Sequence, residues 1–136
     1  MSLHLSQDLL NAITFVLSND QRVVFAYLYG SISSEGIGND IDIAVYLKGQ
    51  ADPHHISADL KYTLYKATDL AADIFDIRSL NQVIEQGDIF GLLYLKNILE
   101  TKHLLVDKDP DLRADFLERY GFRYRECEGL IREALA

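Results

Sequence analysis

Cysteine, proline and tryptophan are scarce in this sequence. Its 136 residues include one cysteine, two prolines and no tryptophan. The lone cysteine, Cys127, excludes a disulfide within the chain, which is typical of a reducing cytosol, so a cytoplasmic protein is expected. Only Pro53 and Pro110 interrupt the chain and no Pro/Gly-rich linker divides it. Its length therefore suits a single domain over residues 1–136.

Basic charge is also scarce. The sequence has 13 Lys and Arg against 21 Asp and Glu, for a net charge of −8. Broad binding to nucleic-acid phosphates needs clustered Lys and Arg, so direct nucleic-acid binding is not expected. Anionic membranes are disfavoured for the same reason. No apolar run approaches the roughly 18 residues that cross a bilayer, and residues 1–8 lack the pattern of a secretory signal. The question is then whether the acidic residues are spread over the surface or gathered in a site.

Helical and strand patterns alternate along the chain. Apolar residues at helical spacing predict a first helix from a Ser6 cap to Asn19, and further helices over residues 54–70, 80–98 and about 109–134. Runs of β-forming residues predict strands over 23–29, 41–47, 72–77 and 102–106. Residues 30–39 are expected to form a loop or a short helical turn. This alternation predicts an α/β (α+β) fold with a small mixed sheet flanked by helices.

Two acidic residues stand two positions apart on the second predicted strand. Asp40 and Asp42 therefore project from the same face. Two adjacent carboxylates repel each other, and a divalent cation relieves that repulsion. Mg²⁺ prefers such oxygen ligands and shares its coordination shell with substrate phosphates. The alternative is that both acids lie at an exposed strand edge, where charge discourages aggregation.

Two neighbouring segments favour the functional interpretation. Gly30 and Ser31 follow a buried strand, and a glycine there lets the backbone approach a ligand closely. Asp73 and Asp76 interrupt the third predicted strand. Being three apart, they face opposite sides of one strand, so only one of them can join the first pair. Three carboxylates beside a Gly-Ser loop suit a two-metal nucleotidyl transfer site.

At this point the sequence resembles a known family. A strand ending in Gly30-Ser31, the Asp40-x-Asp42 pair and a third acid on a later strand look like the minimal nucleotidyltransferase (MNT) group of the DNA polymerase β-like superfamily. Residues 106–116, with Tyr120 and Tyr124, are similar to the tail of MNT antitoxins. The resemblance covers residues 8–128 and implies the polymerase β-like palm fold.

The resemblance also implies roles for individual residues. Gly30 and Ser31 would hold the triphosphate of ATP, and Asp40 and Asp42 would bind two Mg²⁺ ions. Asp73 matches the third acid, binding one metal and helping to activate the attacking hydroxyl, with Asp76 as the alternative.

The loop departs from the family pattern. Members commonly carry an arginine shortly after Gly-Ser and a serine before the acid pair. Residues 31–39 contain no basic residue, include Glu35 and end in Asn39. Lost charge-assisted hydrogen bonds weaken triphosphate binding. We therefore expect metal binding to be retained more securely than turnover.

The resemblance implies an antitoxin that transfers AMP from ATP to a tyrosine of a cognate HEPN ribonuclease toxin, as a hetero-oligomer with that toxin. One alternative is a catalytically weak antitoxin that masks the toxin by binding. A less favoured alternative is adenylylation of a small molecule.

Other candidates have simpler interpretations. His54 and His55 point in different directions on a helix and are expected at the surface or helix start. Residues 107–118 carry acids at EF-hand spacing without the required glycine, so helix capping is favoured. The arginines of the last quarter are expected to pair with Asp115, Glu118, Glu126 and Glu133, and the alternative is that one of them contacts the nucleotide. These arginines are Arg113, Arg119, Arg123, Arg125 and Arg132. Tyr120, Phe122 and Tyr124 could be core residues or part of a partner surface. Cys127 is expected to be an ordinary thiol.

Overall fold

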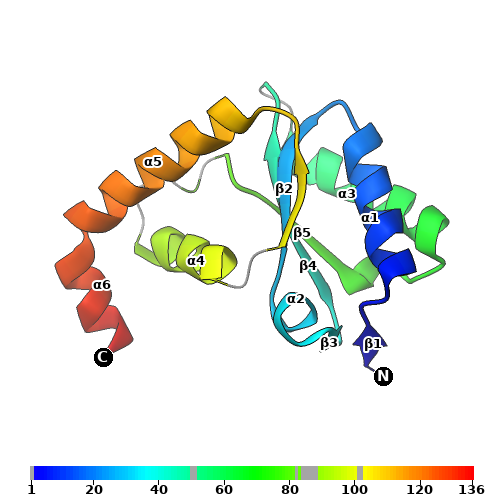
Figure 1. Ribbon diagram of the computed structural model, residues 1–136, viewed down its shortest axis with the longest axis horizontal. Coiled ribbons are helices and arrows are strands. Elements are labelled where there is room, and N and C mark those ends of the chain that lie inside the picture. Colours follow the sequence, from blue (N-terminus) through cyan, green and yellow to red (C-terminus); the bar gives the residue numbers. More distant parts are fainter. Residues whose placement is uncertain (1, 50–51, 82, 84–88, 101–102) are drawn as a thin grey trace.

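The computed structural model describes residues 2–49, 52–81, 83, 89–100 and 103–136, with residue 134 described by its backbone alone. Figure 1 shows a sheet with helices on both sides. The elements in chain order are β1 (Leu3–His4), α1 (Gln7–Asn19), β2 (Val23–Tyr29), α2 (Ser31–Glu35), β3 (Ile37–Gly38), β4 (Ile41–Leu47), α3 (Pro53–Thr68), the 3₁₀ helix η1 (Ala72–Ile74), β5 (Phe75–Ser79), α4 (Ile89–Glu100), β6 (His103–Asp107), α5 (Pro110–Glu126) and α6 (Glu128–Leu135).

Four strands form the main sheet in the order β5-β4-β2-β6, and β1 pairs with β3 in a separate two-stranded ribbon. β2 lies antiparallel to β4 and β6, whereas β4 and β5 run parallel. The predicted mixed sheet flanked by helices is therefore confirmed. β2 and β4 have the predicted bounds, because central strands buried on both faces are continuous apolar runs.

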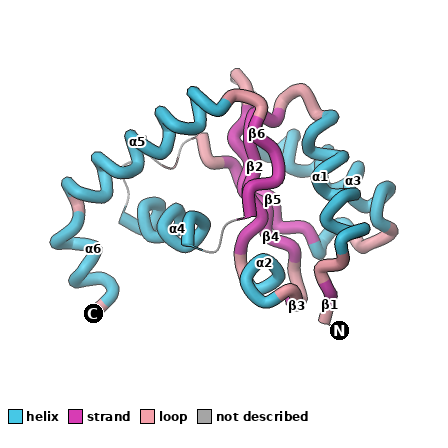
Figure 2. The backbone as a smooth tube through the Cα atoms, in the orientation of Figure 1, coloured by secondary structure: helices cyan, strands magenta, loops and turns pink. Residues whose placement is uncertain are grey.

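Two apolar layers lie on opposite faces of this sheet. Side chains alternate along each strand, so β2 and β4 contribute to both layers. α1 and α3 cover one face, and α4 and α5 cover the other (Figures 1 and 2). The second layer combines strand aromatics with buried residues from these helices, including Phe25, Tyr27, Tyr29, Ala44, Leu95, Ile98 and Phe116.

The third strand begins later than the sequence predicts. Residues 72–77 were expected to form it, but residues 72–74 form η1 and β5 begins at Phe75. α3 ends at Thr68, and the next residue, Asp69, adopts a left-handed backbone with φ 60°. The strand begins only where Phe75 meets Ile41 of β4. Asp76 therefore lies within the strand, and Asp73 lies before it.

The last predicted helix is two helices. Asp109 caps α5 as expected, its side chain accepting from the Leu112 N–H. Helical geometry is interrupted at Cys127, and α6 then turns so that Ile131 is fully buried and α6 contacts α4. Of the helix predicted over residues 80–98, α4 spans Ile89–Glu100, while residues 82 and 84–88 lie outside the described residues. Each described helix is too short or too polar to cross a membrane.

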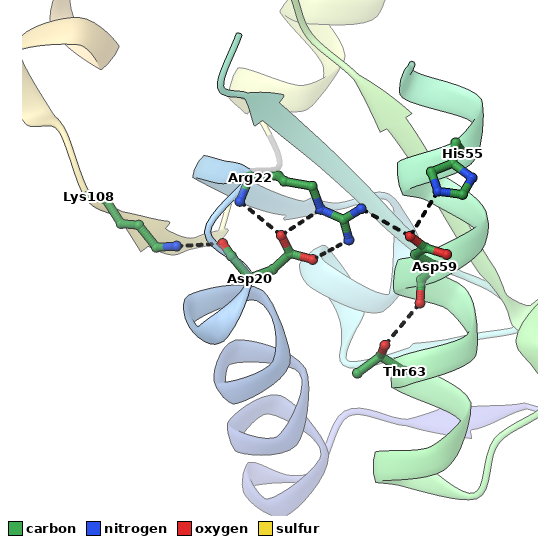
Figure 3. Close-up of polar contacts among 6 residues, drawn as sticks. All are labelled: Asp20, Arg22, His55, Asp59, Thr63 and Lys108. Carbon is green, nitrogen blue, oxygen red and sulfur yellow. Dashed lines mark hydrogen bonds and ion pairs between the residues drawn. The ribbon is translucent and has the colours of Figure 1, made fainter. Parts of the chain in front are cut away.

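Charged side chains tie several elements together at the end of the sheet where β2 begins (Figure 3). Arg22 donates to both carboxylate oxygens of Asp20, at 2.9 and 2.7 Å, and to Asp59 of α3 at 3.0 Å. The His55 Nε2 lies 3.4 Å from the same Asp59 oxygen. The Lys108 Nζ donates to the Asp20 carbonyl at 2.7 Å. The end of α1 is thereby linked to α3 and to the start of the C-terminal region.

Candidate active site

A tyrosine and two acids form a row across three strands. Strand pairing places Tyr29 of β2 opposite Asp42 of β4, and Asp42 opposite Asp76 of β5. Directly opposed residues project from the same face of a sheet. This is the face covered by α4 and α5, since Tyr29 and Ala44 both belong to its apolar layer. The row lies where β2 ends and β4 and β5 begin.

Asp42 carries the clearest electrostatic signature of this row. Burial raises the pKa of its carboxyl group, and the negative charges of Asp76 and Asp40 raise it further. The positive charge of Arg78 opposes this effect. A second acid is therefore close enough to make ionisation of Asp42 unfavourable. Such an arrangement favours a bound cation.

Gly30 lies directly against Asp42. Its φ is +79°, and a Cβ atom added there would lie 2.5 Å from the Asp42 Oδ2. The neighbouring loop is equally compact, because a Cβ at Gly38 would lie 2.9 Å from the Ser31 Oγ. Ser31 begins α2 and is exposed. The structure therefore brings the Gly30-Ser31 segment next to Asp42.

The two candidates for the third acid occupy different positions. Asp76 is half-buried in β5 opposite Asp42, whereas Asp73 is exposed on η1. The negative charge of Asp76 raises the pKa of Asp42. The geometry therefore favours Asp76, the alternative in the sequence prediction, over Asp73. Asp40 precedes β4, is exposed, and also raises the Asp42 pKa.

Sequence reasoning missed two residues beside the acids. The Arg78 Nε lies 3.4 Å from an Asp76 oxygen, and its guanidinium carbon lies 5.7 Å from the centre of the Tyr94 ring. The Tyr94 hydroxyl hydrogen-bonds the Tyr29 hydroxyl at 2.9 Å. Arg78 could have been found as the residue two positions after Asp76, on the same strand face. Tyr94 carries no comparable signal, because only packing brings α4 to this place.

Tyrosine ionisation is disfavoured in this cluster. Burial raises the pKa of Tyr29, and the negative charges of Asp42 and Asp76 raise it further, whereas the hydrogen bond to Tyr94 lowers it. Burial also raises the pKa of Tyr94. Both hydroxyls are therefore neutral near pH 7 and act as hydrogen-bonding groups.

The acids fit a divalent cation by their chemistry. Carboxylate oxygens are the ligands that Mg²⁺ prefers, and Asp42 and Asp76 lie side by side with a raised pKa at Asp42. Among the residues that the structure describes, no three His, Cys, Asp or Glu side chains are already grouped as metal ligands. Asp42 and Asp76 would therefore hold an ion as a pair, and exposed Asp40, two residues before Asp42, is the candidate for a further ligand.

The histidines and the acids after β6 have local roles. His54 and His55 are exposed, and His55 pairs with Asp59 one turn along α3, which confirms their surface interpretation. Asp107 accepts from the Arg113 Nε at 2.9 Å. The capping at Asp109 confirms that this segment begins a helix.

The tail residues show ordinary helix contacts. The expected pairing is confirmed for Arg119 with Asp115 and for Arg123 with Glu126. Arg132 pairs with Glu128, which was not among the expected acids, because Glu128 lies one helical turn before it. Tyr120 packs against the core, whereas Phe122 is 53% exposed, so a partner surface stays a prediction for Phe122. Cys127 is a half-buried free thiol.

Known proteins share this architecture. The family described as Polymerase beta, Nucleotidyltransferase matches residues 11–111. A chain of the toxin–antitoxin MntA–HepT is 21% identical, with a TM-score of 0.59, covering 96% of this chain and 100% of that one. A toxin–antitoxin structure with AMP-PNP is 21% identical, with a TM-score of 0.61, covering 93% and 98%.

A third match comes from a structure of tri-AMPylated Shewanella oneidensis HEPN toxin in complex with MNT antitoxin. It is 22% identical, with a TM-score of 0.59, covering 96% of this chain and 98% of that one. No curated protein matches the chain at a significant level. These likenesses confirm the expected nucleotidyltransferase fold.

Proposed function

The chain belongs to the polymerase beta nucleotidyltransferase family, and on that premise we propose that it transfers AMP from ATP to a tyrosine of a HEPN toxin. The structures with the same fold are described as toxin–antitoxin complexes, one with AMP-PNP and one with an AMPylated toxin. The proposal includes a hetero-oligomer with the toxin and a cytoplasmic location. The observation that carries it is the Asp42–Asp76 pair beside Gly30.

The reaction transfers one nucleotidyl group. The tyrosine oxygen of the toxin bonds to the α-phosphorus, the bond from that phosphorus to the bridging oxygen breaks, and pyrophosphate leaves. Asp76 accepts the proton of the attacking hydroxyl, because its carboxylate is 44% exposed and stands opposite Asp42. The added AMP carries bulk and negative charge, which would oppose RNA binding by the toxin.

Each remaining site residue has a binding role. Asp42 and Asp76, with Asp40, hold Mg²⁺, which when bound neutralises phosphate charge and aligns the reacting groups. Gly30 lets the Asp42 carboxylate lie directly against the start of the Gly-Ser segment, because a Cβ there would lie 2.5 Å from the Asp42 Oδ2. Ser31 offers its exposed hydroxyl to a phosphate oxygen.

A second candidate function is toxin neutralisation by masking alone. The loop of residues 31–39 has no basic residue and contains Glu35. Such a loop binds a triphosphate less tightly than one with an arginine. An antitoxin with weak catalysis would then act by covering the toxin.

Label transfer separates these functions. The protein is incubated with Mg²⁺, ATP labelled at the α-phosphate and a HEPN toxin, and toxin labelling and RNA cleavage are both measured. Asp42→Asn and Asp76→Asn are expected to lower the transfer rate by about 100-fold or more, as for the loss of a catalytic base or ligand.

Asp73→Asn is the matched control, since it removes an exposed acid close in sequence. Its transfer rate is expected to equal that of the wild type. Transfer lost in Asp73→Asn and retained in Asp76→Asn would overturn the assignment of the third acid. Absent labelling, with RNA cleavage inhibited equally by all four proteins, would replace the transferase proposal with masking.

A further inference from the structure

Arg78 is a cation placed on the reactive face of the sheet. It lies two residues after Asp76 on β5, opposite Ala44, in the row next to the acids. Its charge lies beside the cluster, because its Nε is 3.4 Å from an Asp76 oxygen and its guanidinium carbon is 5.7 Å from the centre of the Tyr94 ring. We propose that Arg78 binds a phosphate group of the nucleotide and supplies the positive charge that the Gly-Ser loop lacks. This inference rests on the proposed nucleotidyl transfer.

The present contacts of Arg78 are weak and directed at the site. Its ion pair with Asp76 is long, at 3.4 Å, and the two side chains are 60% and 44% exposed. Exposed pairs of this kind contribute little stability, so exchange of the partner costs little. The Tyr94 ring, 5.7 Å from the guanidinium carbon, holds the cation beside the acids. The Tyr94–Tyr29 hydrogen bond in turn anchors that ring to β2.

Binding of a metal ion and a nucleotide would favour transfer of Arg78 from Asp76 to a phosphate group. A divalent cation bound by Asp42 and Asp76 competes with Arg78 for the Asp76 carboxylate. A nucleotide phosphate arriving at the same place offers Arg78 a new anionic partner. Guanidinium groups bind phosphate with two parallel hydrogen bonds, which gives geometry as well as charge. Residues 31–39 provide no Lys or Arg for this purpose.

Binding of AMP-PNP to the full chain in Mg²⁺ tests the assignment by calorimetry. Arg78→Gln is expected to weaken binding by about 10-fold or more, as for loss of a charge-assisted hydrogen bond. Arg78→Lys keeps the charge and is expected to recover part of this loss. Arg132→Gln removes an exposed arginine paired with Glu128 on α6 and is expected to bind as the wild type does. Adenosine serves as the phosphate-free probe, and its affinity is expected to be the same in all four proteins.

Mn²⁺ binding distinguishes a phosphate contact from an effect through Asp76. Arg78→Gln is expected to bind Mn²⁺ as tightly as the wild type or more tightly, because a competing cation is gone. Unchanged AMP-PNP affinity in Arg78→Gln overturns the assignment, and so does lost Mn²⁺ affinity, which would mean that Arg78 only shapes the acids. Failure of the wild type to bind AMP-PNP would instead refute the proposed transferase, and the role of Arg78 with it.

Discussion

Gly30 shows how one backbone position shapes the site. Alanine there would have a φ of +79° and a Cβ 2.5 Å from the Asp42 Oδ2. We expect Gly30→Ala to lower the free energy of unfolding by about 1–3 kcal/mol, because alanine rarely adopts a backbone with φ 79° and ψ −168°. It should also displace the Asp42 carboxylate and weaken AMP-PNP binding in Mg²⁺. Urea denaturation and calorimetry measure the two effects.

Gly49 provides the matched control for this substitution. Its φ is +74°, and a Cβ there would meet nothing within 4 Å. Gly49→Ala is expected to show a similar loss of stability with unchanged nucleotide binding. Equal nucleotide affinities in the two variants would show that the close approach of Gly30 to Asp42 has no role in binding.

At the scale of elements, Arg22 joins the end of α1 and the start of β2 to α3. It binds Asp20 through two hydrogen bonds and Asp59 through a third. Arg22→Gln is expected to lower the free energy of unfolding by about 1–3 kcal/mol, because charge-assisted bonds between partly buried groups are lost. Urea denaturation at pH 7 measures the change. Arg132→Gln, on an exposed i,i+4 pair, should cost no more than about 0.5 kcal/mol.

The same contact predicts how the free energy of unfolding depends on pH. The Arg22 hydrogen bonds hold the pKa of Asp20 below its ordinary value of 3.8. A carboxyl group with a lowered folded pKa stabilises the fold fully above its ordinary pKa and loses that effect as pH falls through the folded value. Stability of the wild type should therefore fall more steeply below about pH 4 than that of Arg22→Gln. Parallel curves would show that Asp20 and Arg22 are not coupled in solution.

At the scale of the whole molecule, ionisation of Asp42 is expected to lower the free energy of unfolding. Burial and neighbouring charge raise the pKa of Asp42 above 3.8, so its ionisation opposes folding. The free energy of unfolding should fall as pH rises from the ordinary pKa to the raised folded pKa, and the loss is complete above it. At pH 7, Asp42→Asn is expected to gain about 0.5 kcal/mol, as for removal of opposed like charges.

Thermal unfolding at pH 3 and pH 7 measures this effect. Asp42→Asn should have a higher melting temperature than the wild type at pH 7. This difference should shrink toward pH 3, where Asp42 is protonated and therefore as uncharged as asparagine. Mg²⁺ should raise the melting temperature of the wild type and leave that of the variant unchanged, because a bound ligand stabilises the folded state. Asp73→Asn, an exposed control, should behave as the wild type. Lower stability of Asp42→Asn at pH 7 would show that Asp42 makes a net stabilising contact instead.

Prediction from sequence succeeded where local pattern and burial agree. Ser6 caps α1 as expected, its side chain accepting from the Leu9 N–H. The bounds of β2 and β4 were predicted because both strands are apolar on both faces. Prediction was less accurate for β5, which pairs only with β4 among the described strands and is preceded by η1. The break at Cys127 was missed because it depends on contact between α6 and α4, two helices distant in sequence.

The sequence alone therefore determined the fold class, the Asp40–Asp42 pair and the Gly30-Ser31 segment, since each is visible in adjacent residues or in a short periodic pattern. Only the tertiary structure decided which acid stands beside Asp42, because that depends on the register of two parallel strands. It also decided the placing of Arg78 and Tyr94, which come together from a strand and a helix. Strand register and helix packing join residues distant in the chain, and no local pattern records which of them will meet.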